Sequence, residues 1–517
     1  MSRQSVVSTG GRRFSKPQSQ VCQVRCGDKH AENFVAEMLK QSASQCLAVD
    51  GQQYLRPPQA LGKLQYRCDM PQLTGFAGIP AFMKLAYSLG LSNRVADLPL
   101  SKRQSRYSAG KLCEVMIAIL AGGLERVSHI DDVTHDPGLC AALGVERLPD
   151  QATLSRFFRD VTEQTVKFLR QANRHFSRQS ATFKQTLKRL VVDGDTRVVG
   201  VYGKQEGAKA CPRNDGRAQY TFEITTLRNS HDILDGGLLE GATHPAPLFA
   251  ERFEALLEQL SDKCDELVFC GDAAWHSAAI LQQIEAADSS EQVACACRYA
   301  IRAQLNSRLL HAIVVLEEEA WQACDEDTQI AQVQFAFVDT RSGADDRLRR
   351  HVVTRKLLPD KCEEAGQRVL VPQPRYEYFA IVTSLNWKPR RVWGFYNGRT
   401  TVEIILKEGA LGFQMDHLPS ARLAGNGVFC QLLILAYNLV NLFRRLCLPQ
   451  RHCRHHVQTL RRMVLAVPGY VGRSCGGGLT IHCTAQGPQA QLLPRIMTAL
   501  EYWLRPVASL WAAPGLI

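Results

Sequence analysis

This sequence has no long hydrophobic run and no leader-like N-terminus. Its longest apolar stretches, at residues 115–124 and 432–443, are too short to cross a bilayer. The first twenty residues are polar and contain no apolar segment of the secretory type. We therefore expect no membrane segment, and a protein that stays in the reducing cytoplasm.

The sequence also lacks the regular cysteine pairs of a disulfide framework, although it contains 18 cysteines. Most stand singly in apolar stretches, as Cys113, Cys270, Cys430 and Cys447 do, and we interpret them as reduced core residues. The C-terminal segment is crowded with potential metal ligands, namely Cys447, His452, Cys453, His455, His456, Cys475, His482 and Cys483. Because no C-x-x-C pair occurs there, a basic, partly buried helix is the simpler interpretation, and a zinc site is the alternative.

Acidic residues are scarce at both ends of the chain. Residues 1–20 contain four basic side chains and no acid, and residues 451–517 contain seven arginines against Glu501 alone, so most of the net charge of +12 lies at the ends. Such ends are typical of proteins that bind a polyanion such as DNA, and a solvated basic tail is the alternative. With 517 residues, of which 45% are hydrophobic and 22% charged, the chain otherwise has the composition of a folded protein of about three domains.

The first part of the chain is predicted to be helical after a basic arm. We expect the arm and a linker at residues 1–75 and a helical DNA-binding domain at 76–185, because apolar residues there recur three and four apart. Within this domain Asp150 is placed to cap a helix with one apolar face. Arg156 and Arg159 project mainly away from that face, where they either enter a DNA groove or form a solvated basic surface.

After residue 185 the pattern changes to that of an α/β domain. Three strand candidates, at residues 190–195, 220–227 and 233–239, are followed by a helix, a strand and a helix. This order is what a ribonuclease-H-like catalytic core requires. The predicted boundaries are residues 186–300 and 371–446 for a split core, 301–370 for a β-rich insertion and 447–517 for a basic helical C-terminal segment.

Three acids carry the chemistry that the sequence indicates. Asp195 and Asp272 each end a strand candidate, and Glu403 lies in a predicted helix. Because the carboxyl ends of parallel strands meet at one edge of a sheet, the three carboxylates are predicted to converge. Hard oxygen ligands suit Mg²⁺, or Mn²⁺ as a substitute, and such ions promote phosphoryl transfer on nucleic acid. Asp193 competes with Asp195 for the first position, since residues two apart on a strand share a face.

A helix predicted from Tyr396 onwards gives the third acid a polar setting. At about 100° per residue, Tyr396, Arg399, Glu403 and Lys407 form one polar stripe. A carboxylate among such side chains suits a metal ligand beside groups that bind phosphate. An exposed helix with an ion pair between Glu403 and Lys407 is the alternative.

Several short blocks carry a resemblance to a known family. They are Leu154-Ser-Arg-Phe157, Leu190-Val-Val-Asp-Gly-Asp-Thr196, Val201-Tyr-Gly-Lys-Gln-Glu-Gly207, Gly271-Asp-Ala-Ala-Trp275, Phe395-Tyr-Asn-Gly-Arg-Thr-Thr-Val-Glu403 and Ala436-Tyr-Asn-Leu439. Together they resemble DDE-type transposases of bacterial insertion sequences, in the cut-and-paste group with a β-rich insertion and a Tyr-Arg-Glu signature. The likeness extends over most of the chain, and the block that ends at Glu403 is its most specific part.

This resemblance implies a ribonuclease-H-like core in which Asp195, Asp272 and Glu403 hold Mg²⁺, while Tyr396 and Arg399 contact DNA phosphate. It implies double-stranded DNA as the partner, both as terminal inverted repeats and as target DNA. It also implies a homodimer within a synaptic complex. The implied location is the nucleoid in a bacterial cytoplasm.

The sequence departs from the family pattern at one position. The family has a lysine seven residues after the glutamate, where this sequence has Ala410, and Lys407 is the candidate substitute. Two other functions therefore stay open, namely a catalytically inactive DNA-binding protein derived from a transposase and a structure-specific nuclease with the same core. Trp275, Trp321 and Trp387 are candidates for stacking on a base and, more simply, core residues.

Overall fold

A ten-stranded mixed sheet dominates the computed structural model, which describes residues 67–100, 106–180, 186–211, 216–244, 246–339, 343–358, 376–474 and 477–503. The predicted arm lies outside the described residues. The chain divides into a unit of residues 1–69 and a unit of residues 70–517. Every element described below belongs to the second unit.

Five strands form the part of the sheet that was predicted as the ribonuclease-H-like core. They are β2 (Leu190–Gly200), β4 (Ala218–Leu227), β5 (Asp232–Glu240), β6 (Glu266–Gly271) and β7 (Ala296–Arg302). They lie in the order β5-β4-β2-β6-β7, with β2, β6 and β7 parallel and with β4 antiparallel to both of its neighbours. The connecting helices are α8 (Phe249–Leu260) and α9 (Ala278–Asp288). The predicted sequence of three strands, helix, strand and helix is therefore confirmed.

The apolar residues of β2 alternate between two cores, so the strand is buried on both faces. Val192 belongs to the core that α8 and α9 cover, whereas Val191 belongs to the core that contains Tyr396. Asp193 and Asp195 follow Val191 at intervals of two residues. This alternation directs both aspartates to the Tyr396 side of the sheet.

The chain after β7 extends the same sheet. Its elements are α10 (Ser307–Val314), β8 (Gln322–Ala323), β9 (Thr328–Asp339), β10 (Gly343–Leu357) and β11 (Tyr376–Thr383). Because β11 pairs with β7, the sheet continues in the order β7-β11-β10-β9-β8. On the far side, β3 (Lys209–Ala210) pairs with β4. The strands of the predicted insertion are thus joined to the edge of the catalytic sheet and do not form a sheet of their own.

The part of the chain before β2 is helical, as predicted. It contains α2 (Ile79–Ser88), α3 (Leu91–Ala96), α4 (Ala109–Gly122), α5 (Pro137–Leu143), α6 (Gln151–Asp160) and α7 (Glu163–Ser180). Asp150 caps α6, since its carboxylate accepts a hydrogen bond from the Thr153 amide at 2.8 Å. Leu154, Phe157 and Phe158 of α6 are completely buried. The predicted cap and apolar face are both confirmed.

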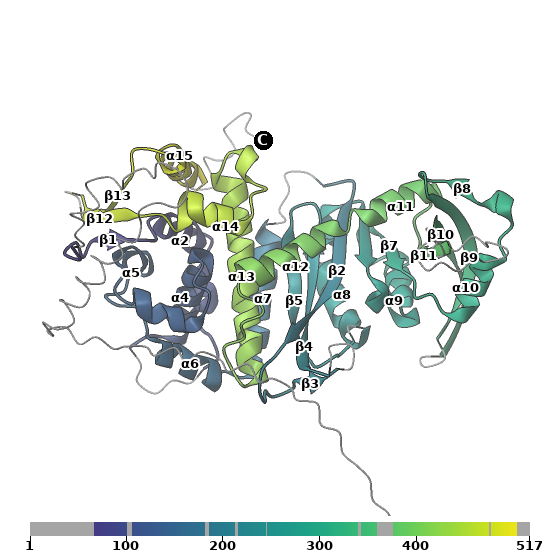
Figure 1. The fold of residues 1–517 in the computed structure, drawn as a ribbon, viewed down its shortest axis with the longest axis horizontal. Coiled ribbons are helices and arrows are strands. Elements are labelled where there is room, and N and C mark those ends of the chain that lie inside the picture. The colour runs from purple at the N-terminus through teal and green to yellow at the C-terminus, as the bar shows by residue number, and fades with distance from the viewer. Residues whose placement is uncertain are drawn as a thin grey trace, which may run out of the picture. The chain divides into compact units, whose positions relative to one another are not determined.

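Helix α13 (Leu423–Cys447) packs against both α7 of the helical part and β5 of the sheet (Figure 1). Among the described residues it is the one helix long and apolar enough to cross a membrane, and 89% of its most apolar window is buried inside the protein. Its polar residues bind backbone: Asn438 both accepts from the Ile233 amide and donates to the Ile233 carbonyl, at 2.9 and 2.8 Å. These bonds identify α13 as a core helix.

The C-terminal segment is only partly helical, which corrects the prediction. Alongside α14 (Val457–Leu460) and α15 (Pro488–Trp503) it contains a hairpin of β12 (Gly469–Arg473) and β13 (Leu479–Cys483). β12 also pairs with β1 (Leu73–Thr74), the first strand of the described chain. The glycines and the β-branched residues of this stretch favour strands over a helix, because glycine weakens a helix and β-branched side chains fit a pleated surface.

The described cysteines are free, and Cys113, Cys270, Cys430 and Cys447 are buried, as predicted. Near the C-terminus, the ring nitrogens of His452 and His455 lie 3.0 Å apart. Within the described residues, no three His, Cys, Asp or Glu side chains lie close enough to hold a metal ion. Cys475 lies outside these residues.

Candidate active site

Asp195 is a nearly buried carboxylate on β2, with 8% of its surface exposed. Burial raises its pKa to about 6, and the Arg399 guanidinium, 3.3 Å from Oδ2, opposes that shift. The negative charges of Asp272 and Glu403 raise the pKa further. Asp272 and Glu403 therefore act on Asp195 through space.

Asp272 and Glu403 reach this place from two different elements. Asp272 follows β6, whose Gly271 is in register with Gly194 of the parallel strand β2. Its carboxylate caps a short 3₁₀ turn by accepting from the Ala274 amide at 3.0 Å. Glu403 lies on the exposed side of the first turn of α12 (Thr400–Gly412). Asp272 follows the end of β6 and Glu403 lies on a helix, as predicted. Asp195 does not end its strand, which corrects the prediction: β2 continues to Gly200, and only its pairing with β6 stops, at Gly194.

The predicted single helix from Tyr396 is in fact two helices. α11 (Pro389–Asn397) ends before Gly398, and α12 begins at Thr400. The predicted polar stripe is divided accordingly, with its first two members buried and Glu403 and Lys407 exposed.

Tyr396 and Arg399 brace β2 and β6 at the place where the pairing of these two strands ends. The Tyr396 hydroxyl donates to the Gly271 carbonyl at 3.2 Å and accepts from Arg399 at 3.4 Å. Arg399 also donates to the Gly194 carbonyl at 3.2 Å. Only 5% of Tyr396 and 8% of Arg399 is exposed, so both side chains are committed to the protein interior. Their contact with DNA phosphate stays a prediction.

Asp193 forms a buried ion pair with a residue that the sequence did not mark. No part of Asp193 is exposed, and Arg228 Nε lies 2.8 Å from its Oδ2. Arg228 also donates to the Phe395 carbonyl at 2.8 Å, near the end of α11. Arg228 is 35 residues from its partner and follows β4 as a lone arginine, so no local pattern points to it. Asp193 thus has a structural partner, whereas Asp195 faces the other acids.

Comparison with known proteins decides the family. The sequence model described as "Transposase DDE domain group 1" matches residues 59–503, which is most of the chain. The chain belongs to this DDE transposase family. It is therefore an enzyme of DNA cleavage and strand transfer, and the resemblance seen in the sequence is confirmed. No curated protein matches the sequence of this transposase.

Solved structures similar to the transposase share little sequence with it. A piggyBac transposase synaptic complex with hairpin DNA is 10% identical, with a TM-score of 0.37, over 85% of this chain and 83% of that one. A Mos1 transposase paired-end complex with the left transposon end is 18% identical, with a TM-score of 0.14, over 36% and 58% of the two chains. Family membership therefore rests on the sequence match.

Ala410, which stands where the resemblance implies a lysine, faces the core. Ala410 is 8% exposed and lies on the buried side of α12, where an ammonium group would lose its hydration. Lys407 is exposed on the same helix as Glu403. Of the two positions, only that of Lys407 offers a cation to a ligand at the exposed face of α12.

The two predicted DNA-binding arginines of the helical part are exposed on α6. Arg156 donates to the Thr153 hydroxyl at 3.2 Å, and Arg159 pairs with Asp160 at 2.9 Å. α6 packs against α13 and not against the strands that carry the acids. The structure thus leaves both arginines accessible, and their binding to DNA stays a prediction.

Replacing Arg399 by Gln tests whether this side chain braces the site or binds phosphate. We expect cleavage to fall by about tenfold or more, because Asp195 loses its charged partner. The slope of log affinity for DNA against log salt concentration should not change if the buried side chain only braces the site. A phosphate contact would instead reduce that slope by about 0.9. The exposed Lys407→Gln provides the matched comparison, for which the slope is expected to fall.

Removing Arg228 tests whether Asp193 and Asp195, both on β2, have different roles. Arg228→Ala leaves the Asp193 carboxylate buried without its partner, so we expect the free energy of unfolding to drop by about 3 kcal/mol. Asp193→Asn should also lower stability, whereas Asp195→Asn should lower cleavage with little loss of stability. Urea unfolding and a DNA nicking assay measure the two effects. A stable but inactive Asp193→Asn protein would contradict this division.

Proposed function

We propose that this transposase cleaves the ends of the bacterial insertion sequence that encodes it and joins them to target DNA, with Asp195, Asp272 and Glu403 as its catalytic acids. The observation that supports this most directly is that the charges of Asp272 and Glu403 raise the pKa of Asp195, which lies on β2 one residue beyond its pairing with β6. A nearly buried carboxylate whose pKa is raised by the charges of two other acids favours a cation.

The chemistry of the three donors suits Mg²⁺, with Mn²⁺ as a substitute, although within the described residues these side chains do not lie close enough together to hold an ion. All three side chains offer hard carboxylate oxygens, and the unfavourable charge around Asp195 is what a divalent cation would relieve. When bound, such a cation would stabilise charge on the phosphodiester oxygens. The chain itself fixes the ligands, because Arg399 orients Asp195 while the Ala274 amide holds Asp272.

The proposed partner is double-stranded DNA, first as terminal inverted repeats and then as target DNA. Lys407 beside Glu403, and Arg156 with Arg159 on α6, are the exposed cations proposed to contact its phosphates. A homodimer in a synaptic complex would hold two ends together. We place this reaction at the nucleoid of a bacterial cytoplasm.

A plasmid assay tests the function. The substrate is a supercoiled plasmid that carries the parent gene with its flanks, incubated with the full chain and Mg²⁺ or Mn²⁺. We expect excision at the flanks, followed by products joined to a second plasmid. Cleavage without joined products would indicate a nuclease. Binding without any cleavage would indicate an inactive DNA-binding protein.

A further inference from the structure

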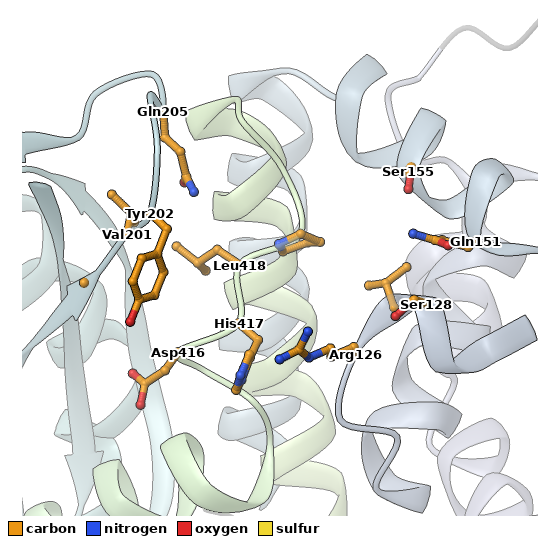
Figure 2. A pocket seen from close by; sticks show the side chains of 13 residues that line it. Arg126, Ser128, Gln151, Ser155, Val201, Tyr202, Gln205, Asp416, His417 and Leu418 are labelled. Carbon is orange, nitrogen blue, oxygen red and sulfur yellow. The ribbon is translucent and has the colours of Figure 1, made fainter. Parts of the chain in front are cut away.

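A polar pocket of about 550 Å³ opens beside the sheet and belongs to none of the predicted sites (Figure 2). Its walls come from the helical part, from the loop after β2 and from the loop before α13. The side chains that matter below are Arg126, Gln151, Ser155, Tyr202, Gln205 and His417. Figure 2 shows the Tyr202 ring on one wall and Ser155 and Gln151 on the opposite wall.

Tyr202 is 90% exposed although its loop is firmly held. Asn426, which is completely buried, donates to the side-chain oxygen of Gln205 at 3.1 Å. The Glu206 amide donates to the Ala421 carbonyl at 2.9 Å. The loop is thus fixed to the start of α13 while it presents an aromatic ring to solvent. A ring held in this way is ready to stack on a flat partner with little loss of entropy.

The pocket carries positive charge and hydrogen-bond donors. Arg126 and His417 are exposed, and neither forms an ion pair with any residue that the structure describes. The carboxylate in the pocket, Asp416, is paired with Arg197 at 2.8 Å, so its charge is neutralised. At the exposed start of α6, Gln151 adds a side-chain amide and Ser155 adds a hydroxyl group. Such a set of groups suits a phosphate beside a planar ring.

We propose that this pocket binds one unpaired nucleotide of the DNA, with Tyr202 stacked on the base and with Arg126 and His417 at its phosphate. The inference rests on the proposed function, because it places the nucleotide on the strand that passes Asp195. β2 leads from Asp195 towards the pocket, and the seven residues to Tyr202 span at most about 23 Å. At 3.4 Å per nucleotide of one strand, the bound base lies no more than about seven nucleotides from the cleaved phosphate.

The tryptophans weighed from the sequence are less suited to this task. Trp275 is 1% exposed and Trp321 is 8% exposed, so both are core residues. Trp387 is half-buried and is already stacked between the guanidinium groups of Arg189 and Arg391. Of these four aromatic side chains, Tyr202 alone presents a free ring.

Fluorescence anisotropy on the full chain tests the proposal. The probes are labelled duplexes from the DNA that flanks the parent gene, each with one unpaired base at a successive distance from the cleaved phosphate, in Ca²⁺ to prevent cleavage. We expect binding about tenfold tighter than to the paired duplex when that base lies at one particular position within about seven nucleotides of the cleaved phosphate. An abasic nucleotide at that position should remove the gain.

Variants identify the side chains. Tyr202→Ala should lose the gain and Tyr202→Phe should keep it, because stacking needs only the ring. Arg126→Ala should weaken binding of the whole series, unlike Arg495→Ala, which removes an exposed arginine on α15. If Tyr202→Ala matches the unmodified protein throughout while metal-dependent cleavage is intact, the pocket inference is wrong and the proposed function stands. If the unmodified protein never cleaves, the proposed function itself fails.

Discussion

We expect Asp272→Asn and Glu403→Gln each to lower metal-dependent DNA cleavage by at least about 10³-fold. Each substitution keeps the shape of the side chain and removes one negative charge from the group around Asp195. With one charge fewer, the site holds a divalent cation less well and loses one oxygen ligand of the proposed set. Single-turnover nicking of the flank-bearing plasmid measures the loss directly.

Two matched variants control for the change of charge. Asp262→Asn and Glu254→Gln alter exposed acids that precede β6 and lie outside the proposed site. Both variants should cleave DNA at the normal rate. DNA affinity should stay within about twofold for all four proteins, because none of these acids attracts phosphate. Cleavage by Glu403→Gln within about tenfold of the unmodified protein would remove Glu403 from the proposed acids.

The largest loss of stability is expected from Glu408→Ala, at about 3–5 kcal/mol in the free energy of unfolding. Glu408 and Arg444 are each 4% exposed, and their charged atoms lie 3.1 Å apart. Glu408 also accepts a hydrogen bond from the Val457 amide at 2.7 Å. The substitution removes the ionic partner of the Arg444 guanidinium and leaves the Val457 amide without its acceptor. Since Glu408 also joins α12 to α13, the position of Glu403 depends on it.

Urea unfolding followed by circular dichroism measures this loss. Ile404→Ala on the same helix is the control, because Ile404 is 56% exposed and its removal should change stability by less than about 0.5 kcal/mol. Replacing Glu408 and Arg444 together by leucine should recover much of the stability, as the buried charge disappears. A loss below about 1 kcal/mol in Glu408→Ala would show that Arg444 finds another partner.

The features predictable from the sequence are those set by short-range periodicity. The apolar run before Asp272 placed that acid just after β6, and the alternation along β2 placed Asp195 on a strand, although the strand continues to Gly200 and does not end at the acid. The cap at Asp150 needs only residues three apart. In each case the spacing of apolar residues along a few turns or strand positions determines the element.

The break between α11 and α12 depends on a contact from a distant part of the chain. A glycine within a helical pattern is tolerated at a cost of about 1 kcal/mol, so Gly398 gave no clear stop signal. In the folded protein a Cβ at this position would lie 2.9 Å from an Arg228 nitrogen. Periodicity does not reveal which polar side chain will be buried, so the ion pair of Arg228 and Asp193 could not be predicted from the sequence either.

The central position of α13 also sets when the enzyme can first act. About 250 residues lie between β2 and the end of α13, and a ribosome adds roughly 5–20 residues per second. A nascent chain therefore carries Asp195 for about 10–50 s before the helix that covers its sheet exists. Because β1 pairs with β12, the last part of the chain must also be made before the first described strand finds its partner. Activity thus begins only near the end of synthesis.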